Sequence, residues 1–276
     1  MSAVTAERQR PYVLGTDLQR VWNLTWTLAA TEFKLRFYGS VLGYAWTLAR
    51  PFLFFGVIYL VFSEIAGLDA NVENYGVYIL FGLVLFQFFS EATNGCVRCL
   101  AVRENLLRKM RFPRLVIPLS VVLTAIFNLA GTLAAALIFA VAAGVYPTWS
   151  WLELPVIIVA VGAFATGVGL LLSALFVRYR DVAPIWEVAS QMLFYISPIL
   201  YVTTLVPEQY RDWFLINPLA VLLTEMRAAV VDTSAPHSWD LVGPAPLLAA
   251  GALVVIAVVL GLYVFNRQAP RIAEEL

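Results

Sequence analysis

The chain has 276 residues, of which 61% are hydrophobic, and its 18 Lys and Arg balance its 18 Asp and Glu. A net charge of zero argues against a nucleic-acid-binding protein, because duplex binding depends on neutralising phosphates. The mean hydropathy of +0.82 and several long apolar runs indicate an integral membrane protein instead. The first 38 residues are polar and charged, so we expect no cleavable signal peptide.

Residues 18–37 predict an amphipathic helix. Apolar residues recur at i+3 or i+4 spacing and fill one arc of the helix: Leu18, Trp22, Trp26, Ala29, Phe33 and Phe37. Polar residues fill the opposite arc: Arg20, Asn23, Thr27, Thr31 and Lys34. Such a helix suits the plane of the membrane interface, with Trp22 and Trp26 facing the lipid. The alternative, packing on a soluble core, is disfavoured because we expect no soluble domain.

Six transmembrane spans are predicted after this N-terminal segment of residues 1–38. They cover about 44–66, 75–96, 115–143, 152–177, 184–202 and 246–265. Together they form a predicted domain over 39–267, followed by a tail over 268–276. Fifteen Lys and Arg fall on one side of these spans, and only Arg211 and Arg227 fall on the other. The positive-inside rule therefore predicts that both termini are cytoplasmic.

A basic loop at 98–114 separates the second span from the third. Its cations are Arg98, Arg103, Arg108, Lys109, Arg111 and Arg114. Topogenic charge alone explains these residues, but it does not explain the helical apolar row that includes Val102 and Leu106. We favour a short helix that docks on a soluble partner.

The segment 204–230 does not fit a further span, because its apolar pieces are short and Asn217-Pro218 interrupts them. Two readings are equally supported. Two short helices dip into the outer leaflet as a re-entrant gate, or two amphipathic helices lie on the outer surface.

Several motifs resemble one family of membrane proteins. They are RFYGSVLGYAW at 36–46 with Arg50-Pro51, ENLLRK at 104–109 with FPR at 112–114, RYRD at 178–181, SPILY at 197–201, and Asn217-Pro218 followed by Arg227. Their order is similar to that in the permease subunits of ABC type-2 exporters, especially exporters of O-antigen and other cell-surface polysaccharides.

The resemblance implies a homodimer with two copies of a separate ABC ATPase and a channel at the dimer interface. It implies an ATPase-coupling set of Arg103, Glu104, Asn105, Leu106, Arg108, Lys109, Arg180 and Asp181. It also implies that the N-terminal helix marks a lateral portal for a lipid-linked glycan. The predicted portal and channel set is Trp22, Trp26, Trp46, Arg50, Phe52, Phe55 and Tyr59, and the predicted gate is Asn217 and Pro218.

Two parts of this set also have simpler structural explanations. Arg50 lies inside the first span and suits a pyrophosphate headgroup, but snorkelling to the nearby interface is the favoured reading. The first-span aromatics suit sliding sugar rings, and ordinary packing explains them equally well.

No catalytic site is expected in this chain. It has no phosphate-binding G-x-x-x-x-G-K-[ST] loop, so ATP and magnesium are expected on the partner ATPase, with no cofactor here. Cys96 and Cys99 form a C-x-x-C pattern, but zinc needs more ligands and His237 is predicted on the opposite side, so reduced structural cysteines are expected.

We therefore predict an all-α integral membrane protein of six spans, with an N-terminal interfacial helix and short re-entrant helices before the last span. It is expected in a bacterial cytoplasmic membrane as the channel-forming subunit of an exporter of a polyprenyl-diphosphate-linked polysaccharide, such as O-antigen or galactan. Alternatives are an exporter of teichoic acid, a drug or another lipid. A polyprenyl-lipid transferase ranks low, because the cytoplasmic loops carry few acids beyond Glu104 and Asp181.

Overall fold

The computed structural model describes residues 18–38, 43–65, 67, 72–109 and 113–268. Within these ranges every regular element is a helix, which confirms the all-α prediction. The longer helices are α1 (Leu18–Phe37), α2 (Gly43–Tyr59), α3 (Tyr75–Val97), α6 (Val116–Ala142), α7 (Leu154–Arg178), α8 (Val182–Ile196) and α12 (Pro244–Gln268). The shorter ones are η1 (Leu60–Ile65), α4 (Cys99–Val102), α5 (Glu104–Lys109), η3 (Trp149–Glu153), η4 (Thr203–Leu205), α9 (Glu208–Phe214), α10 (Pro218–Met226), η5 (Arg227–Val231) and α11 (Ser238–Val242).

Five helical segments are long and apolar enough to cross a membrane. They are Ala45–Ser63, Tyr75–Val97, Val116–Ala142, Trp149–Arg178 and Pro244–Gln268, and they match the predicted first, second, third, fourth and sixth spans. The pieces Glu208–Phe214 and Pro218–Val231 meet at 107°, the geometry of a broken span or a re-entrant pair. The predicted break at Asn217-Pro218 is therefore present.

The predicted fifth span over 184–202 is shorter than expected. The corresponding helix α8 has 15 residues, which span about 22 Å against a hydrocarbon core of about 30 Å. It ends because Ser197 precedes Pro198 and adopts an extended backbone, as the residue before a proline prefers.

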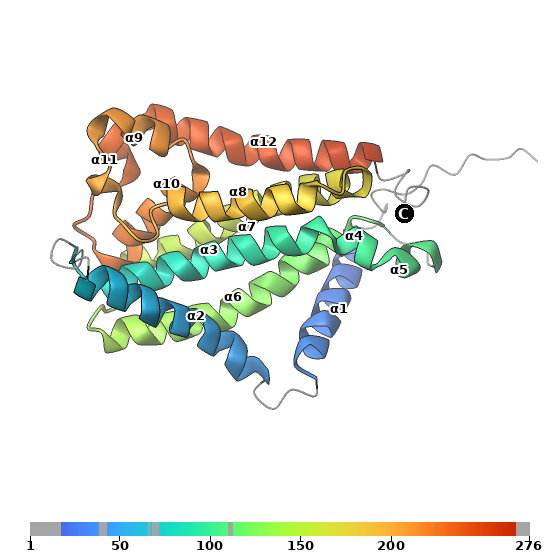
Figure 1. Cartoon of the computed structure of the whole chain (residues 1–276), viewed down its shortest axis with the longest axis horizontal. Coiled ribbons are helices and arrows are strands. Elements are labelled where there is room, and N and C mark those ends of the chain that lie inside the picture. The colour runs from blue at the N-terminus through green and yellow to red at the C-terminus, as the bar shows by residue number, and fades with distance from the viewer. Residues whose placement is uncertain (1–17, 39–42, 66, 68–71, 110–112, 269–276) are drawn as a thin grey trace, which may run out of the picture.

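The two ends of the helix bundle differ in charge. Figure 1 shows α4, α5 and the end of α12 at one end, and α9 and α11 at the other. We call the first the basic end, because it carries Arg98, Arg103, Arg114, Arg178, Arg180 and Arg267. The opposite end carries acids that include Glu153, Glu208, Asp212 and Asp240. In Figure 1, α1 stands steeply across the direction of the long helices beside the basic end.

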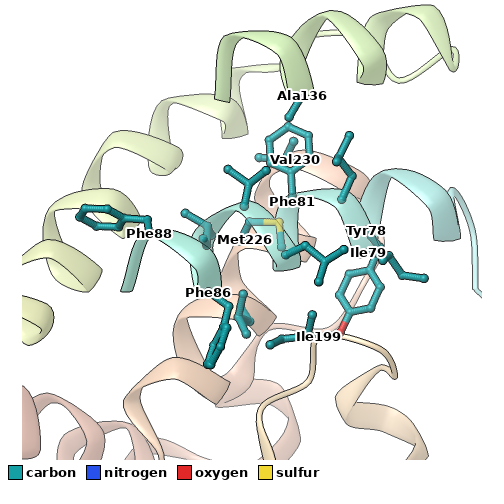
Figure 2. Packing of buried hydrophobic residues seen from close by; sticks show 14 of the residues in the cluster. Tyr78, Ile79, Phe81, Phe86, Phe88, Ala136, Ile199, Met226 and Val230 are labelled. Carbon is teal, nitrogen blue, oxygen red and sulfur yellow. The ribbon is translucent and has the colours of Figure 1, made fainter. Parts of the chain in front are cut away.

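The core is centred on α3. About 78% of its membrane-length segment is buried, against 11% for the first and last candidate spans. Figure 2 shows Tyr78, Phe81 and Phe88 of α3 among residues from α6, α10 and η5. The Tyr78 hydroxyl donates to the carbonyls of Pro198 and Tyr201, so the segment after α8 is tied to this central helix. Because α3 is central, its polar residues lie where several helices meet.

Helices α7 and α12 lie in close backbone contact, and glycines permit the approach. A Cβ added at Gly261 would lie 2.3 Å from the Gly167 carbonyl oxygen, and one at Gly167 would lie 2.5 Å from the α12 backbone. Membrane helices often associate through such small residues, because close backbone contact replaces the hydrophobic driving force that lipid removes.

This packing makes different predictions for two glycines of one helix. Gly261→Ala forces the two backbones apart, and we expect it to destabilise the fold by about 1–3 kcal/mol. Gly251→Ala is the matched control, because nothing lies within 4 Å of the added carbon. Thermal unfolding of the purified variants in detergent measures the difference. Equal melting temperatures for the two variants would contradict the close-packing account.

Candidate functional site

A groove of about 1440 Å³ runs between α2, α3 and α8. Its lining changes from one end to the other. Arg36, Trp46, Thr47 and Arg50 lie toward the start of α2, whereas Phe54, Val57, Leu83 and Phe86 line the part further along the helix. The groove therefore joins a polar, cationic part to an apolar, aromatic part.

A polar strip on α3 forms one wall of the groove. Gln87, Ser90, Glu91 and Asn94 all line it, at the spacing that places residues on one helix face. The Ser90 hydroxyl lies 3.3 Å from the Ser190 hydroxyl of α8, and Gln191 adds an amide from the same helix. Polar side chains at membrane depth are costly unless they face water or protein, so this wall is unsuited to lipid.

Glu91 is the acid of this strip, and two helices hold it. Arg36 Nη1 of α1 lies 2.5 Å from Glu91 Oε1, and Asn128 Nδ2 of α6 donates to the same oxygen at 2.7 Å. No motif in the sequence points to this pair. An acid in an apolar span does signal a basic partner, but the separation of 55 residues hides which one.

Helix α2 carries the predicted channel residues on two opposite faces. At about 100° per residue, Trp46, Arg50, Leu53, Phe54 and Val57 fall within one arc of about 100°, and all five line the groove.

Phe52, Phe55 and Tyr59 fall on the other side of α2, so the structure does not place them on the groove wall. Phe55 is 8% exposed and packs on Phe139 of α6, and Phe52 and Tyr59 pack against the same core. The predicted aromatic set combined these two faces because its first spacing, from Trp46 to Phe52, is not a helical repeat.

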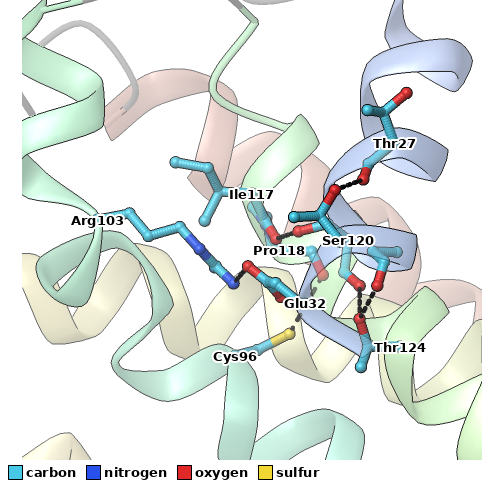
Figure 3. A network of polar contacts seen from close by, with 10 residues as sticks. Thr27, Glu32, Cys96, Arg103, Ile117, Pro118, Ser120 and Thr124 are labelled. Atoms are coloured by element: carbon cyan, nitrogen blue, oxygen red, sulfur yellow. Dashed lines mark hydrogen bonds and ion pairs between the residues drawn. The ribbon is translucent and has the colours of Figure 1, made fainter. Parts of the chain in front are cut away.

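Helix α1 has three sectors rather than two. Val21, Thr25 and Ala29 are buried, and α1 packs along α6, where the Thr124 hydroxyl lies 3.5 Å from the Ala29 carbonyl (Figure 3). Trp22 and Trp26 flank this contact and stay about half exposed, although Trp26 also meets Phe127 of α6 edge-on. The aromatic sector thus lies between the packing face and the polar arc.

A second ion pair ties α1 to the predicted coupling segment. Arg103, between α4 and α5, bonds the Glu32 carboxylate, as Figure 3 shows. Both side chains are mostly buried, at 17% and 25% exposure. The structure therefore directs Arg103 toward α1, although it was predicted to contact the ATPase.

The remaining predicted coupling residues lie at the basic end. Glu104 and Leu106 are partly buried in α5, Asn105 is exposed, and Arg180 and Asp181 are exposed between α7 and α8. The side chains of Arg108 and Lys109, and residues 110–112, lie outside the described part of the chain.

The predicted gate residues begin α10. The Asn217 side chain accepts a hydrogen bond from the Leu219 N–H at 3.1 Å and donates to the Ser197 hydroxyl at 3.1 Å. Pro218 is buried at the first helical position, where its missing N–H costs nothing. Asn217 thus links the start of α10 to the segment that follows α8.

The C-x-x-C residues are buried thiols. Burial raises the pKa of Cys99 to about 12, so this thiol stays protonated at neutral pH. Within the described residues, no three His, Cys, Asp or Glu side chains lie close enough together to hold a metal ion.

These features describe a multi-pass membrane protein whose long apolar helices border a groove with a polar wall. The chain belongs to the ABC-2 type transporter family, whose sequence profile matches residues 23–231. Members of this family are membrane components of transporters, and the match confirms the family predicted from the motifs.

Three relatives indicate which branch of the family is similar. The chain is 28% identical over 261 residues to an O-antigen export system permease protein RfbA of Klebsiella pneumoniae, covering 94% of this chain and 97% of the relative. It is 29% identical over 265 residues to an RfbA of Myxococcus xanthus, covering 95% and 99%. It is 23% identical over 219 residues to the polysialic acid transport protein KpsM of Escherichia coli, covering 79% and 84%.

The Arg103–Glu32 pair makes a prediction about how α1 is held. Glu32→Arg and Arg103→Glu each place like charges together, and we expect each to lower stability by about 1–3 kcal/mol. The double exchange restores an ion pair and recovers most of that loss. Melting temperatures of the three purified variants measure the coupling, and strictly additive losses would contradict a direct pair.

Proposed function

We propose that this chain is the membrane subunit of an ATP-driven exporter that moves a lipid-linked polysaccharide out of the cytoplasm. Two copies enclose the pathway, and two copies of a separate ABC ATPase dock at the basic end. The observation that carries this proposal is the groove, because its wall of two amides, one hydroxyl and one carboxylate lies on a helix of membrane length.

The polar groove supports a dimer on physical grounds. Its wall faces outward between α2 and α8, and lipid offers no hydrogen bonds to Gln87, Ser90 or Asn94. A second copy covering this side converts two open grooves into one enclosed, hydrated path. Exposed apolar residues on both flanking helices, such as Val57 and Val188, supply surface for that contact.

The groove also suits a glycan better than an apolar drug. Sugar hydroxyls exchange hydrogen bonds with amide and hydroxyl side chains, and aromatic faces such as Phe54 and Tyr195 offer apolar surface to sugar rings. A hydrated polymer cannot cross about 30 Å of hydrocarbon unaided. The names of the RfbA and KpsM relatives, which refer to O-antigen export and polysialic acid transport, support the same substrate class.

The distribution of charged residues gives the orientation of the chain in the membrane. The basic end belongs in the cytoplasm by the positive-inside rule, which places α5 where a soluble ATPase can reach it. The α9–α10 bend then lies on the outer side, where Asn217 and Pro218 would act at the exit. The steep setting of α1, with Trp22 and Trp26 half exposed, supports a place in the cytoplasmic interface beside the groove entrance.

A charge added at Asn105 tests the docking of the ATPase. Asn105 is exposed on α5, so Asn105→Arg adds a cation to the proposed docking surface without disturbing the core. In a strain lacking the wild-type gene, we expect this variant to reach normal abundance but to lose surface polysaccharide and co-purification of the ATPase.

The control for this test is Gln209→Arg, which adds the same charge to an exposed position of α9 at the opposite end. It should export normally. Normal export by the Asn105 variant would refute docking at α5. Unchanged surface polysaccharide in the deletion strain itself would refute the exporter proposal.

A further inference from the structure

The charged side chains of the groove do not balance. Among the 19 lining residues in the described part of the chain, only Arg36, Arg50 and Glu91 carry a charge, so these residues give an excess of one positive charge. Both arginines belong to the part nearest the start of α2. In a site with low-dielectric walls, such an excess raises the local concentration of anions.

Arg50 supplies an unused guanidinium. It is exposed to the groove and forms no hydrogen bond or ion pair with another residue in the described part of the chain. Its Cα lies seven residues after Gly43, about 10 Å along the helix. An arginine at such a depth is costly unless it meets water or an anion, so its position favours an anionic ligand.

Arg36 is only partly used. Its contact with Glu91 engages one nitrogen, and its side chain is 47% exposed. A guanidinium has five N–H donors in a planar fork, so donors remain for a ligand in the groove. Glu91 does not depend on Arg36 alone, because Asn128 also donates to it. Arg36 can therefore leave Glu91 without stranding that carboxylate.

We propose that Arg36 and Arg50 form a binding site for the diphosphate group of a lipid carrier, and that Glu91 competes with this group for Arg36. The inference rests on the proposed export of a lipid-linked glycan and names the part of that substrate the groove recognises. Two guanidinium forks match the several oxygens of a diphosphate better than they match a neutral sugar. Leu53 and Val57 continue along the same α2 face and offer apolar surface to the attached chain.

Competition by Glu91 would keep the site weak enough to release its ligand. The carboxylate occupies Arg36, so its removal frees that guanidinium and strengthens binding. Glu91→Gln keeps an oxygen that accepts from Asn128 and removes only the charge. The competition predicts that loss of the Glu91 charge and loss of either arginine change the affinity for the diphosphate in opposite directions.

The test is a titration of the full-length chain, in nanodiscs of neutral phosphatidylcholine, with radiolabelled geranylgeranyl diphosphate. We expect Arg36→Gln and Arg50→Gln each to weaken binding about tenfold. Glu91→Gln should tighten binding severalfold. Arg178→Gln, which removes an exposed arginine from the end of α7, should bind as the wild type does. Melting temperatures establish that each variant is folded.

A double variant separates competition from bulk charge. If Glu91 acts through Arg36, then Arg36→Gln with Glu91→Gln binds like Arg36→Gln alone. Tighter binding by the double variant than by Arg36→Gln alone would overturn the competition. Wild-type affinity in both arginine variants would overturn the proposed diphosphate site. Nanodiscs containing phosphatidylglycerol supply the other source of lipid phosphate. Equal displacement of the probe by that lipid would overturn the preference for a diphosphate.

The outcomes distinguish this site from the function on which it rests. Loss of surface polysaccharide in the deletion strain, with no binding that depends on Arg36 or Arg50, would refute the diphosphate site and leave the exporter standing. Binding that depends on both arginines, in a chain whose deletion leaves surface polysaccharide unchanged, would refute the exporter.

Discussion

The carboxylate of Glu91 brings polar side chains from two other helices to α3. A charge on a buried, membrane-length helix must be paired, and here the partners come from α1 and α6. One side chain of α3 thereby contacts two other helices. The Glu32–Arg103 pair repeats the arrangement with the signs exchanged, since here α1 supplies the acid and the coupling segment supplies the base. Helix α1 is therefore held by two ion pairs in addition to its contact with α6.

These two pairs connect the proposed docking surface to the groove. Arg103 precedes α5 directly, and Glu32 and Arg36 lie one turn apart on α1, so movement of α5 has a short polar route to Glu91. The apolar core around α3 gives this route a rigid support, because closely packed helices shift as units rather than deforming. At the other end, Tyr78 and Asn217 hold the segment after α8 from two sides, which joins the predicted gate to the same central helix.

Much of the fold follows from local sequence, and most of the site does not. Long apolar runs predict the five segments of membrane length, and the alternation of basic and acidic loops predicts their two ends. The early end of α8 was missed because one proline, Pro198, outweighs an apolar run that continues beyond it. The groove wall of α2 does not follow from composition, because Trp46 and Phe52 are both aromatic but lie on different faces of the helix. The pairs of Arg36 with Glu91 and of Arg103 with Glu32 join residues 55 and 71 positions apart, so no local pattern identifies the partners.

The proposed function requires the glycan to pass along the groove between α2, α3 and α8. Its most direct test is photo-crosslinking in cells that export the polysaccharide, with benzoylphenylalanine in place of Phe54 on the groove wall. Tyr263 of α12 is the matched control, because it is aromatic and similarly exposed, at 60% against 52%, but lies outside the groove. Passage along the groove gives polymer-sized adducts at position 54 and none at 263. Equal adducts at both positions, or adducts at 263 alone, would contradict it.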